Sequence, residues 1–409
     1  MNTMQDNKIG EQSGSAEFFD TIVIGGGQAG LAMGYHLTRQ GRDFVILDER
    51  ERVGDAWRQR WDSLRLFTPA KFNGLPGTRF PGDRLSFPTK DEQADYLEMY
   101  AGEHGLLVRA GMRVDRLWQE GDSFLVTSGH SRLAADHVVI ATGPSHTPRV
   151  PEFASDLSPS VFQLHSHDYR GPQQLQAGDV LVVGVGNSGA EIALELSRTH
   201  RTLLAGKESA EIPMRHGRAA ARFGLPVVRF LGMHVLTLNT PIGRKVAPGF
   251  TAHATPLIRT KRKDLAAAGV ESVGRVVGVR EGLPVVGGEQ ALEGDQTVDV
   301  SNAVDVSNVL DVSNVVWCTG FRDDFSWVDL PAFDENSRPI HHRGVVPSVP
   351  GLYFLGREFQ FAAVSATLPG VGRDAAYIAG NIASARLNGS DRRPPSRTPT
   401  APLVNQRST

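Results

Sequence analysis

One supersecondary unit occurs twice in this chain. Each copy consists of a short apolar strand, a Gly-x-Gly-x-x-Gly turn, a helix and a second strand, and the copies begin TIVIGGGQAGLAMGYHL and DVLVVGVGNSGAEIALEL. Strands that alternate with helices predict parallel sheets, because the crossover helix returns the chain to run in the same direction. We therefore expect an α/β fold with two Rossmann-like, doubly wound nucleotide-binding domains, the second inserted in the first.

The first copy has the full context of a dinucleotide-binding turn, since its glycines follow an expected strand at residues 21–24 and open a helix. The first glycine allows a tight turn, the second lets a pyrophosphate approach the backbone, and the third permits close packing of the helix. The N-terminus of the helix attracts phosphate. The expected contacts are Gly25, Gly27, Gln28, Ala29 and Gly30.

An acidic residue completes this first fingerprint. Asp48 ends the next strand, 23 residues after Gly25, and Glu49 follows it. A carboxylate at this position can accept hydrogen bonds from ribose hydroxyls. Because strand, turn, helix and acid are in register, we predict that the first copy binds FAD.

The second copy differs from the first at the acid position. Lys207 lies 23 residues after the first glycine of its turn, where the first copy has Asp48. A carboxylate there would repel the 2′-phosphate of NADPH, whereas an ammonium group would attract it. We predict NADPH rather than NADH, with Arg215 as a second phosphate partner; the alternative for Lys207 is a solvated surface lysine. The other expected contacts are Gly184, Gly186, Asn187, Ser188 and Gly189.

Each copy is followed later in the chain by a strand that ends in Thr-Gly. VVIATG contains Thr142 and Gly143, and VVWCTG contains Thr319 and Gly320. These repeats give the expected domain limits: an FAD domain in two parts (18–162 and 319–387), an NADPH domain (163–318), and polar, disordered tails (1–17 and 388–409). Residues 216–258 are an expected insertion that either covers the flavin and substrate or extends the NADPH domain core.

Residues 299–316 are three copies of a hexapeptide, DVSNAV, DVSNVL and DVSNVV. A single strand of this length would span about 60 Å, so we expect the repeat to fold back as a hairpin or to loop out. Strand alternation would place one set of apolar residues on one face: Val300, Val304, Val306, Leu310, Val312 and Val316.

Charge and cysteine content exclude several classes of protein. The formal net charge is −2, which gives no general attraction for nucleic acid. No apolar run approaches the roughly 20 residues of a membrane span, and the polar N-terminus lacks the features of a signal peptide, so we expect a cytoplasmic protein. Cys318 is the only cysteine, which excludes a dithiol redox pair and a cysteine-rich metal site. No metal is expected.

Over residues 18–385 the chain resembles the flavin-containing monooxygenase superfamily, most closely its short bacterial branch of FAD- and NADPH-dependent oxidoreductases. GDAWRQRWDSL at residues 54–64, which contains Trp57, resembles the Gly-Gly-x-Trp segment after the FAD acid. VGVGNSGAEIA and VVWCTGF are similar to the motifs of the second fold. LPGVGRDAAYIAG resembles the C-terminal flavin segment, and this resemblance implies that Asp374 lies near the flavin.

The linker motif departs from the family pattern. LHSHDYR at residues 164–170 lacks the expected glycine and has Tyr169 where the Baeyer–Villiger branch has tryptophan. The resemblance offers His165 and Tyr169 as weak catalytic candidates, and a structural role in the linker is the preferred interpretation of both. In LRLFTPAKF, Phe67 occupies the position of a family asparagine, which leaves the oxidised substrate open.

The resemblance implies that NADPH reduces FAD, that O2 then forms a C4a-(hydro)peroxyflavin, and that oxygen passes to a small organic substrate such as an amine, a sulfide or an α-keto acid. The alternative is an NADPH:acceptor flavin oxidoreductase without oxygen insertion. A non-catalytic nucleotide sensor is a third hypothesis. We also leave open a homodimer.

Overall fold

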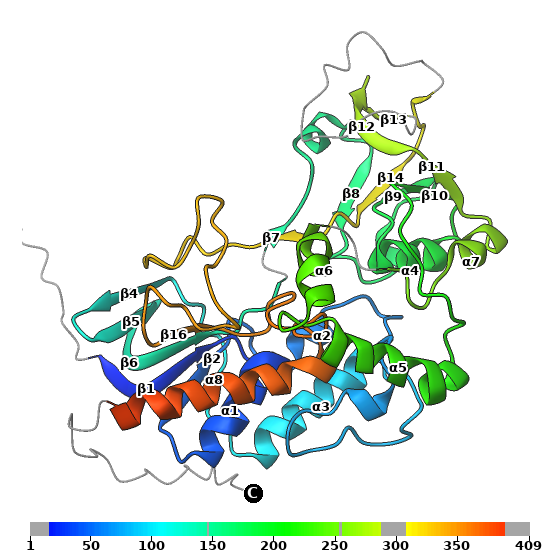
Figure 1. Ribbon diagram of the computed structural model, residues 1–409. Coiled ribbons are helices and arrows are strands. Elements are labelled where there is room, and N and C mark those ends of the chain that lie inside the picture. Colours follow the sequence, from blue (N-terminus) through cyan, green and yellow to red (C-terminus); the bar gives the residue numbers. More distant parts are fainter. Residues whose placement is uncertain (1–15, 145–146, 253–255, 288–307, 389–409) are drawn as a thin grey trace, which may run out of the picture.

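One mixed and one parallel sheet organise the protein, whose computed structural model describes residues 16–144, 147–252, 256–287 and 308–388 (Figure 1). The first sheet has the order β3-β2-β1-β6-β5-β4, with β16 also paired to β6. Its strands are β1 (Glu17–Ile24), β2 (Phe44–Leu47), β3 (Val108–Arg109), β4 (Arg116–Glu120), β5 (Ser123–Ser128), β6 (Ser131–Ile140) and β16 (Leu352–Phe354). The pairs β4–β5 and β5–β6 are antiparallel, and the other pairs are parallel.

The two faces of this sheet are covered differently. Val23 of β1 points into a core shared with α1 (Gln28–Arg39), α3 (Lys90–Glu103) and α8 (Leu368–Asn388). Ile22 and Ile24 point to the opposite face, which is covered by residues of the 325–349 segment. Strand β1 is therefore buried on both sides, as its almost continuous apolar sequence requires.

The second sheet is entirely parallel, with the order β11-β10-β9-β14-β8. Its strands are β8 (Phe162–His165), β9 (Val180–Val183), β10 (Thr202–Ala205), β11 (Glu271–Val273) and β14 (Asn314–Trp317). Helices α4 (Asn187–Leu196) and α7 (Arg262–Ala267) cover one face. The hairpin of β12 (Arg275–Arg280) and β13 (Leu283–Gly287), with η2 (Glu152–Asp156), covers the other. The predicted pair of Rossmann-like folds is confirmed.

The repeated glycine turns have the same geometry in both sheets. Gly25 and Gly184 have φ of +110° and +115°, in the region that favours glycine. A Cβ on Gly30 would lie 1.9 Å from the carbonyl oxygen of Gly25, and a Cβ on Gly189 would lie 1.8 Å from that of Gly184. Each third glycine therefore lets its helix pack directly on the turn.

The chain crosses between the sheets just after each Thr-Gly. β7 (Thr147–Pro148) follows the first and β15 (Phe321–Arg322) follows the second, and the two pair as antiparallel strands. Figure 1 shows this pair between the two units. The shorter elements α2 (Asp55–Arg58), η1 (Ala70–Phe72) and η3 (Pro172–Gln174) lie in the connections.

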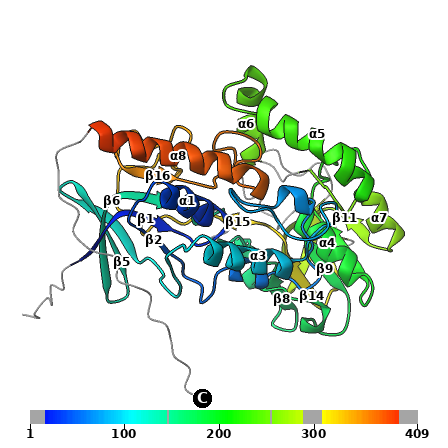
Figure 2. The same ribbon diagram turned by 90° about the horizontal axis from the view of Figure 1, so that it is seen from below.

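Most of residues 218–252 are helical, and they reach the first unit. They form η4 (Ala220–Gly224), α5 (Leu225–Phe230), η5 (Leu231–Val235) and α6 (Pro241–Ala252). The amide of Leu238 donates to Phe361 O over 2.8 Å, and the amide of Ala363 donates to Leu236 O over 3.0 Å. Figure 2 shows α5 and α6 beside the N-terminal end of α8. The insertion thus connects the second unit to the C-terminal part of the first.

Several expected boundaries differ from the structure by a residue. β1 already begins at Glu17, which pairs with Arg109 at 2.6 Å, so this residue is not part of a tail. α8 extends to Asn388, and Phe162 belongs to the second sheet. The rest of both expected tails lies outside the described residues. None of the helices in the described ranges combines the length and hydrophobicity that a bilayer span requires.

The hexapeptide repeat is only partly within the described residues, since residues 288–307 are not among them. Val309 forms an antiparallel bridge with Val285 of β13, and β14 begins only at Asn314. Leu310 and Val312 pack against one face of the second sheet, whereas Val316 packs against the other. The expectation that these three residues share a face is wrong, because the chain bends at Ser313 before β14 begins. Val300, Val304 and Val306 lie outside the described residues.

Candidate functional site

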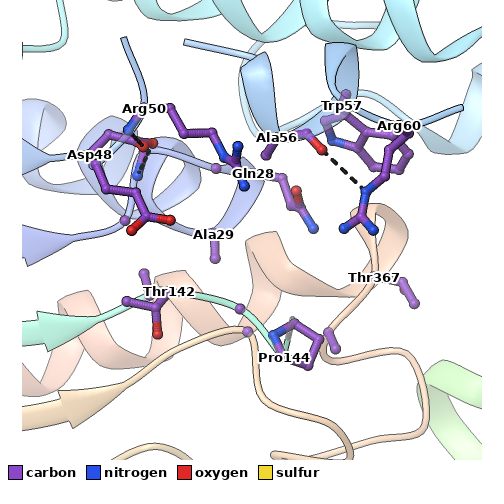
Figure 3. Close-up of a pocket in the computed structure, with 18 of the residues that line it drawn as sticks. Gln28, Ala29, Asp48, Arg50, Ala56, Trp57, Arg60, Thr142, Pro144 and Thr367 are labelled. Carbon is purple, nitrogen blue, oxygen red and sulfur yellow. Dashed lines mark hydrogen bonds between the residues drawn. The ribbon is translucent and has the colours of Figure 1, made fainter. Parts of the chain in front are cut away.

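A cavity of about 970 Å³ lies at the carboxyl ends of the parallel strands, between the two units. Its wall includes the first glycine turn, the end of β2, the chain around α2, residues 64–68, 112–115, 141–144 and 366–369, and the first turn of α4. Figure 3 shows Gln28, Asp48, Trp57, Arg60, Thr142 and Thr367 around it. The carboxyl edge of a parallel sheet is the usual ligand site of such folds, because the helix N-termini point there.

Hydrogen bonds hold the first glycine turn and its acid together. Asp48 Oδ2 accepts a hydrogen bond of 2.7 Å from the amide of Gly26, and Oδ1 accepts one of 2.9 Å from the amide of Arg50. Burial raises the pKa of the Asp48 carboxyl, and the two amide hydrogen bonds oppose this rise. The Asp48 carboxylate lines the cavity and can accept further hydrogen bonds there.

Gly27 fits the approach of a pyrophosphate. It is the N-cap of α1, with no side-chain hydrogen bond to the first turn and no acidic residue there. A Cβ added to it would meet no protein atom within 4 Å. The protein therefore does not itself need glycine at this position for packing, whereas a ligand that contacts the backbone would. The lining of the cavity fits the adenosine diphosphate part of FAD.

A basic and aromatic wall faces this turn. Trp57, Arg60 and Trp61 line the cavity, together with Arg50. The Arg60 Nε–H donates to Ala56 O over 3.3 Å, and burial lowers the pKa of its guanidinium. Arg50 and Arg60 were not among the predicted site residues. Arg60 lies in the segment 54–64, from which only Trp57 was predicted.

The second nucleotide turn opens into the same cavity. Asn187 and Ser188, in the first turn of α4, line it, and Glu191 follows one turn later. The Asn187 side chain holds the 256–258 segment, since its amide donates to Pro256 O over 3.1 Å and its oxygen accepts from Ile258 N over 2.9 Å. Both nucleotide folds therefore contribute to one space.

Glu191 joins the two units through Arg259. The carboxylate accepts two hydrogen bonds from the Arg259 guanidinium, at 2.6 and 3.1 Å. The same guanidinium donates to the carbonyl oxygen of Arg65 in the first unit. Burial raises the pKa of Glu191, and the charge of Arg259 opposes this. The glycine motif did not predict a role for Glu191, because its contact with Arg259 exists only in the folded protein.

Other predicted residues lie away from the cavity. Lys207 and Arg215 are exposed in the chain after β10. The Thr319 hydroxyl donates to Arg149 O beside the crossing strands. Asp374 is fully buried in α8 and has one carboxylate oxygen, Oδ2, without a hydrogen-bond partner in the part of the chain that the structure describes. The prediction that these four residues bind a cofactor stays a prediction.

His165 and Tyr169 are both engaged in buried contacts. His165 Nδ1 accepts from the amide of His167 over 3.0 Å, which places the ring proton on Nε2, at 3.1 Å from Gly320 O. Burial lowers the pKa of His165, which favours the neutral ring. Tyr169 is fully buried, and its hydroxyl donates to Glu195 over 2.8 Å. Neither side chain lines the cavity. This placement favours the structural role over the catalytic one.

Phe67 lines the cavity at the position where the family pattern has asparagine. Its carbonyl oxygen lies 3.0 Å from His216 Nε2, at the start of the insertion. A further ring contact joins His216 to Phe87, with centroids 4.0 Å apart. The insertion therefore begins directly against the wall of the cavity.

Comparison with known proteins agrees with this architecture. A family model described as pyridine nucleotide-disulphide oxidoreductase matches residues 22–216. Because Cys318 is the only cysteine, the likeness concerns the nucleotide-binding folds and not a redox-active dithiol. The structure of a flavin-containing monooxygenase from Stenotrophomonas maltophilia is similar with a TM-score of 0.69 and 26% identity, covering 90% of this chain and 99% of that one.

Two curated relatives define the similarity in sequence. The indole-3-pyruvate monooxygenase YUCCA1 of Oryza sativa subsp. japonica is 32% identical over 197 residues, which are 47% of this chain and 48% of that protein. The uncharacterised oxidoreductase CzcO-like of Geobacillus kaustophilus is 39% identical over 366 residues, which are 89% of this chain and 98% of that protein. The chain thus belongs to the flavin-containing monooxygenase superfamily, a flavoprotein family that uses FAD and NADPH, as an oxidoreductase of its CzcO-like branch.

Proposed function

We propose that this oxidoreductase is an NADPH-dependent flavin monooxygenase that inserts one atom of O2 into a small organic substrate. The observation that carries the proposal is the shared cavity, in which the first turn of α1 and the first turn of α4 line one space of about 970 Å³. Two nucleotides bound at these turns would extend into the same space, so that hydride transfer and oxygen chemistry would occur at one place.

Bound FAD would accept the hydride and react with O2. The protein would position the FAD and protect it from water. Gly27 and the N-terminus of α1 would bind the pyrophosphate, and Asp48 would bind the ribose of FAD. Arg60 supplies a positive charge to the same region. The apolar wall, which includes Trp57, Trp61, Leu64, Leu66 and Leu368, would exclude water from the reacting end.

We assign NADPH to the second glycine turn because two exposed cations, Lys207 and Arg215, follow it in the chain. β10 ends at Ala205, and Lys207 lies two residues later, next to the place where a Rossmann fold normally has the acid that binds the adenine ribose. Exposure suits a lysine that binds a phosphate on a solvent-facing nucleotide. Arg215 is the second proposed partner, and Asn187 and Ser188 would lie next to the pyrophosphate.

Three further expectations stay proposals. The domain limits follow the two sheets, with the boundary corrections given above. A homodimer and a cytoplasmic location rest on the sequence argument alone.

The test is oxygen accounting on the purified holoenzyme. NADPH consumption and hydrogen peroxide are measured without substrate and with three probes: an aryl methyl sulfide, a tertiary amine and an aryl α-keto acid. We include the α-keto acid because a relative named as an indole-3-pyruvate monooxygenase matches about half of this chain. A monooxygenase shows less peroxide per NADPH with at least one probe, and a product that contains one atom from ¹⁸O2. Peroxide equal to NADPH with every probe would instead support an NADPH:acceptor oxidoreductase.

A further inference from the structure

The helical insertion carries a local positive charge that the net charge of the chain conceals. Residues 212–263 contain no aspartate or glutamate, although the chain as a whole has a formal net charge of −2. Between residues 215 and 252 the arginines and lysines are Arg215, Arg218, Arg222, Arg229, Arg244 and Lys245. Only Arg218 of these takes part in an ion pair within the described residues, with Asp83. The segment therefore presents unneutralised cations.

Exposed apolar side chains are concentrated in the same segment. Phe223, Val227 and Phe230 follow one another at intervals of four and three residues and are 69%, 57% and 58% exposed. This spacing places them on one side of a helix. Leu231, which is 42% exposed, adjoins them, and we call these four residues the α5 ridge. Among described residues, seven of the fourteen exposed large hydrophobic side chains lie between Phe223 and Val246, so the concentration is local.

The opposite side of the same helical stretch is firmly packed, so the ridge is not part of an unfolded region. Ala221 and Leu225 are buried. Gly232 is also buried, and a Cβ there would lie 2.8 Å from a methyl group of Val364. The Arg373 guanidinium of α8 donates to Met233 O over 2.7 Å. The protein thus fixes this helix on the first unit and leaves the ridge outward, at one edge of the molecule (Figure 2).

We propose that the α5 ridge binds the surface of an anionic lipid bilayer, with its apolar side chains in the interfacial layer and Arg222, Arg244 and Lys245 near the lipid phosphates. A fixed apolar ridge among arginines and lysines is the pattern of a helix that lies in the plane of a membrane interface. Charge favours this occupant over a second copy of the chain, because a symmetric contact would bring the same cations together. The binding is peripheral and needs no spanning helix.

Vesicle sedimentation of the holoenzyme tests the proposal. One set of vesicles is phosphatidylcholine alone, and the other contains about 30% phosphatidylglycerol, which supplies the negative surface charge. The double variant Phe223→Ser/Phe230→Ser is compared with Leu107→Ser/Ile340→Ser, which removes two side chains of similar exposure elsewhere, 47% and 50%. FAD content and the NADPH oxidation rate of both variants confirm that each is folded.

The expected result is binding of the wild type to the anionic vesicles that is about tenfold stronger than to phosphatidylcholine and that falls at high salt. The ridge variant loses about tenfold or more of this binding, and the control variant keeps it. Equal binding of the two variants, or no preference for anionic vesicles, overturns the proposal. So does a wild type that is dimeric by light scattering while the ridge variant is monomeric, since the ridge would then bind a second copy.

Discussion

The amide of Gly26 donates a hydrogen bond of 2.7 Å to Asp48 Oδ2, which joins the glycine turn to the end of the neighbouring strand. The sequence separates these residues by a whole helix, α1, yet the structure makes them one unit. The acid therefore has two tasks: it fixes the turn, and it presents its remaining lone pairs to the cavity.

Replacing Asp48 by alanine should weaken FAD binding about 10- to 100-fold, as expected for the loss of hydrogen bonds to a charged group. The buried amide of Gly26 would also lose its acceptor, so the stability of the apoprotein should fall by about 1–3 kcal/mol. Fluorescence titration with FAD and urea unfolding measure the two effects. Asp156→Ala is the matched control, because Asp156 is an exposed aspartate that does not line the cavity. Unchanged FAD affinity in Asp48→Ala would remove this residue from the site.

Gly27→Ala separates cofactor binding from folding. A Cβ at this position meets no protein atom within 4 Å, and the φ of −75° suits alanine, so the free energy of unfolding of the apoprotein should hardly change. FAD affinity should fall by roughly tenfold or more, because the methyl group occupies the path of the pyrophosphate. Gly102→Ala, in α3, also adds a methyl group in open space and should leave FAD binding intact. Normal FAD binding by Gly27→Ala would show that the backbone is not approached here.

Lys207→Glu should change the preference between the two nicotinamide nucleotides. The KM for NADPH should rise about 10- to 100-fold, since a charge-assisted contact with the 2′-phosphate is lost and a repulsion is added. The KM for NADH should stay level or fall. Lys263→Glu makes the same charge change at another exposed position and serves as the control. A parallel rise for both nucleotides, or no rise at all, would contradict the assignment of Lys207.

His341 should make the protein less stable in mild acid. Burial, with the charges of Arg357 and His342, lowers its pKa to about 4, against about 6.5 in an unfolded chain. As the pH falls from about 6.5 to about 4, the unfolded chain binds a proton that the folded protein does not, so stability is lost over this window. His341→Gln should reduce the loss by roughly 2–3 kcal/mol in urea unfolding at pH 7 and pH 4.5. The exposed His342→Gln should not, and identical pH dependence in His341→Gln and the wild type would refute the argument.

Local patterns in the sequence were enough to predict the two folds. Gly25, Asp48 and Thr142 follow from strand, turn and helix periodicity, and the structure brings all three to the wall of one cavity, while their contact with FAD stays a prediction. Contacts that depend on how distant segments meet were not accessible in this way. Glu191 and Thr367 reach the cavity only because the two units and the start of α8 converge there.

The orientation of Asp374 was not evident from its motif. Its position along α8 turns its carboxylate into the protein interior, beside Arg373 at 3.4 Å, and its expected place near the flavin stays a prediction. The sequence also did not show which surface the insertion packs against. An apolar periodicity indicates that a helix has a buried face, but not which part of the protein covers that face. The structure places that face on the first unit.

The most direct test of the central claim is the reaction of the NADPH-reduced holoenzyme with O2 in a rapid-mixing spectrophotometer. A monooxygenase should show an absorbing species, distinct from reduced and oxidised flavin, that persists for seconds while NADP⁺ stays bound and decays faster when a substrate is added. Direct return to the oxidised flavin spectrum with stoichiometric hydrogen peroxide, under the same conditions, would contradict the claim and identify a flavin oxidoreductase that does not insert oxygen.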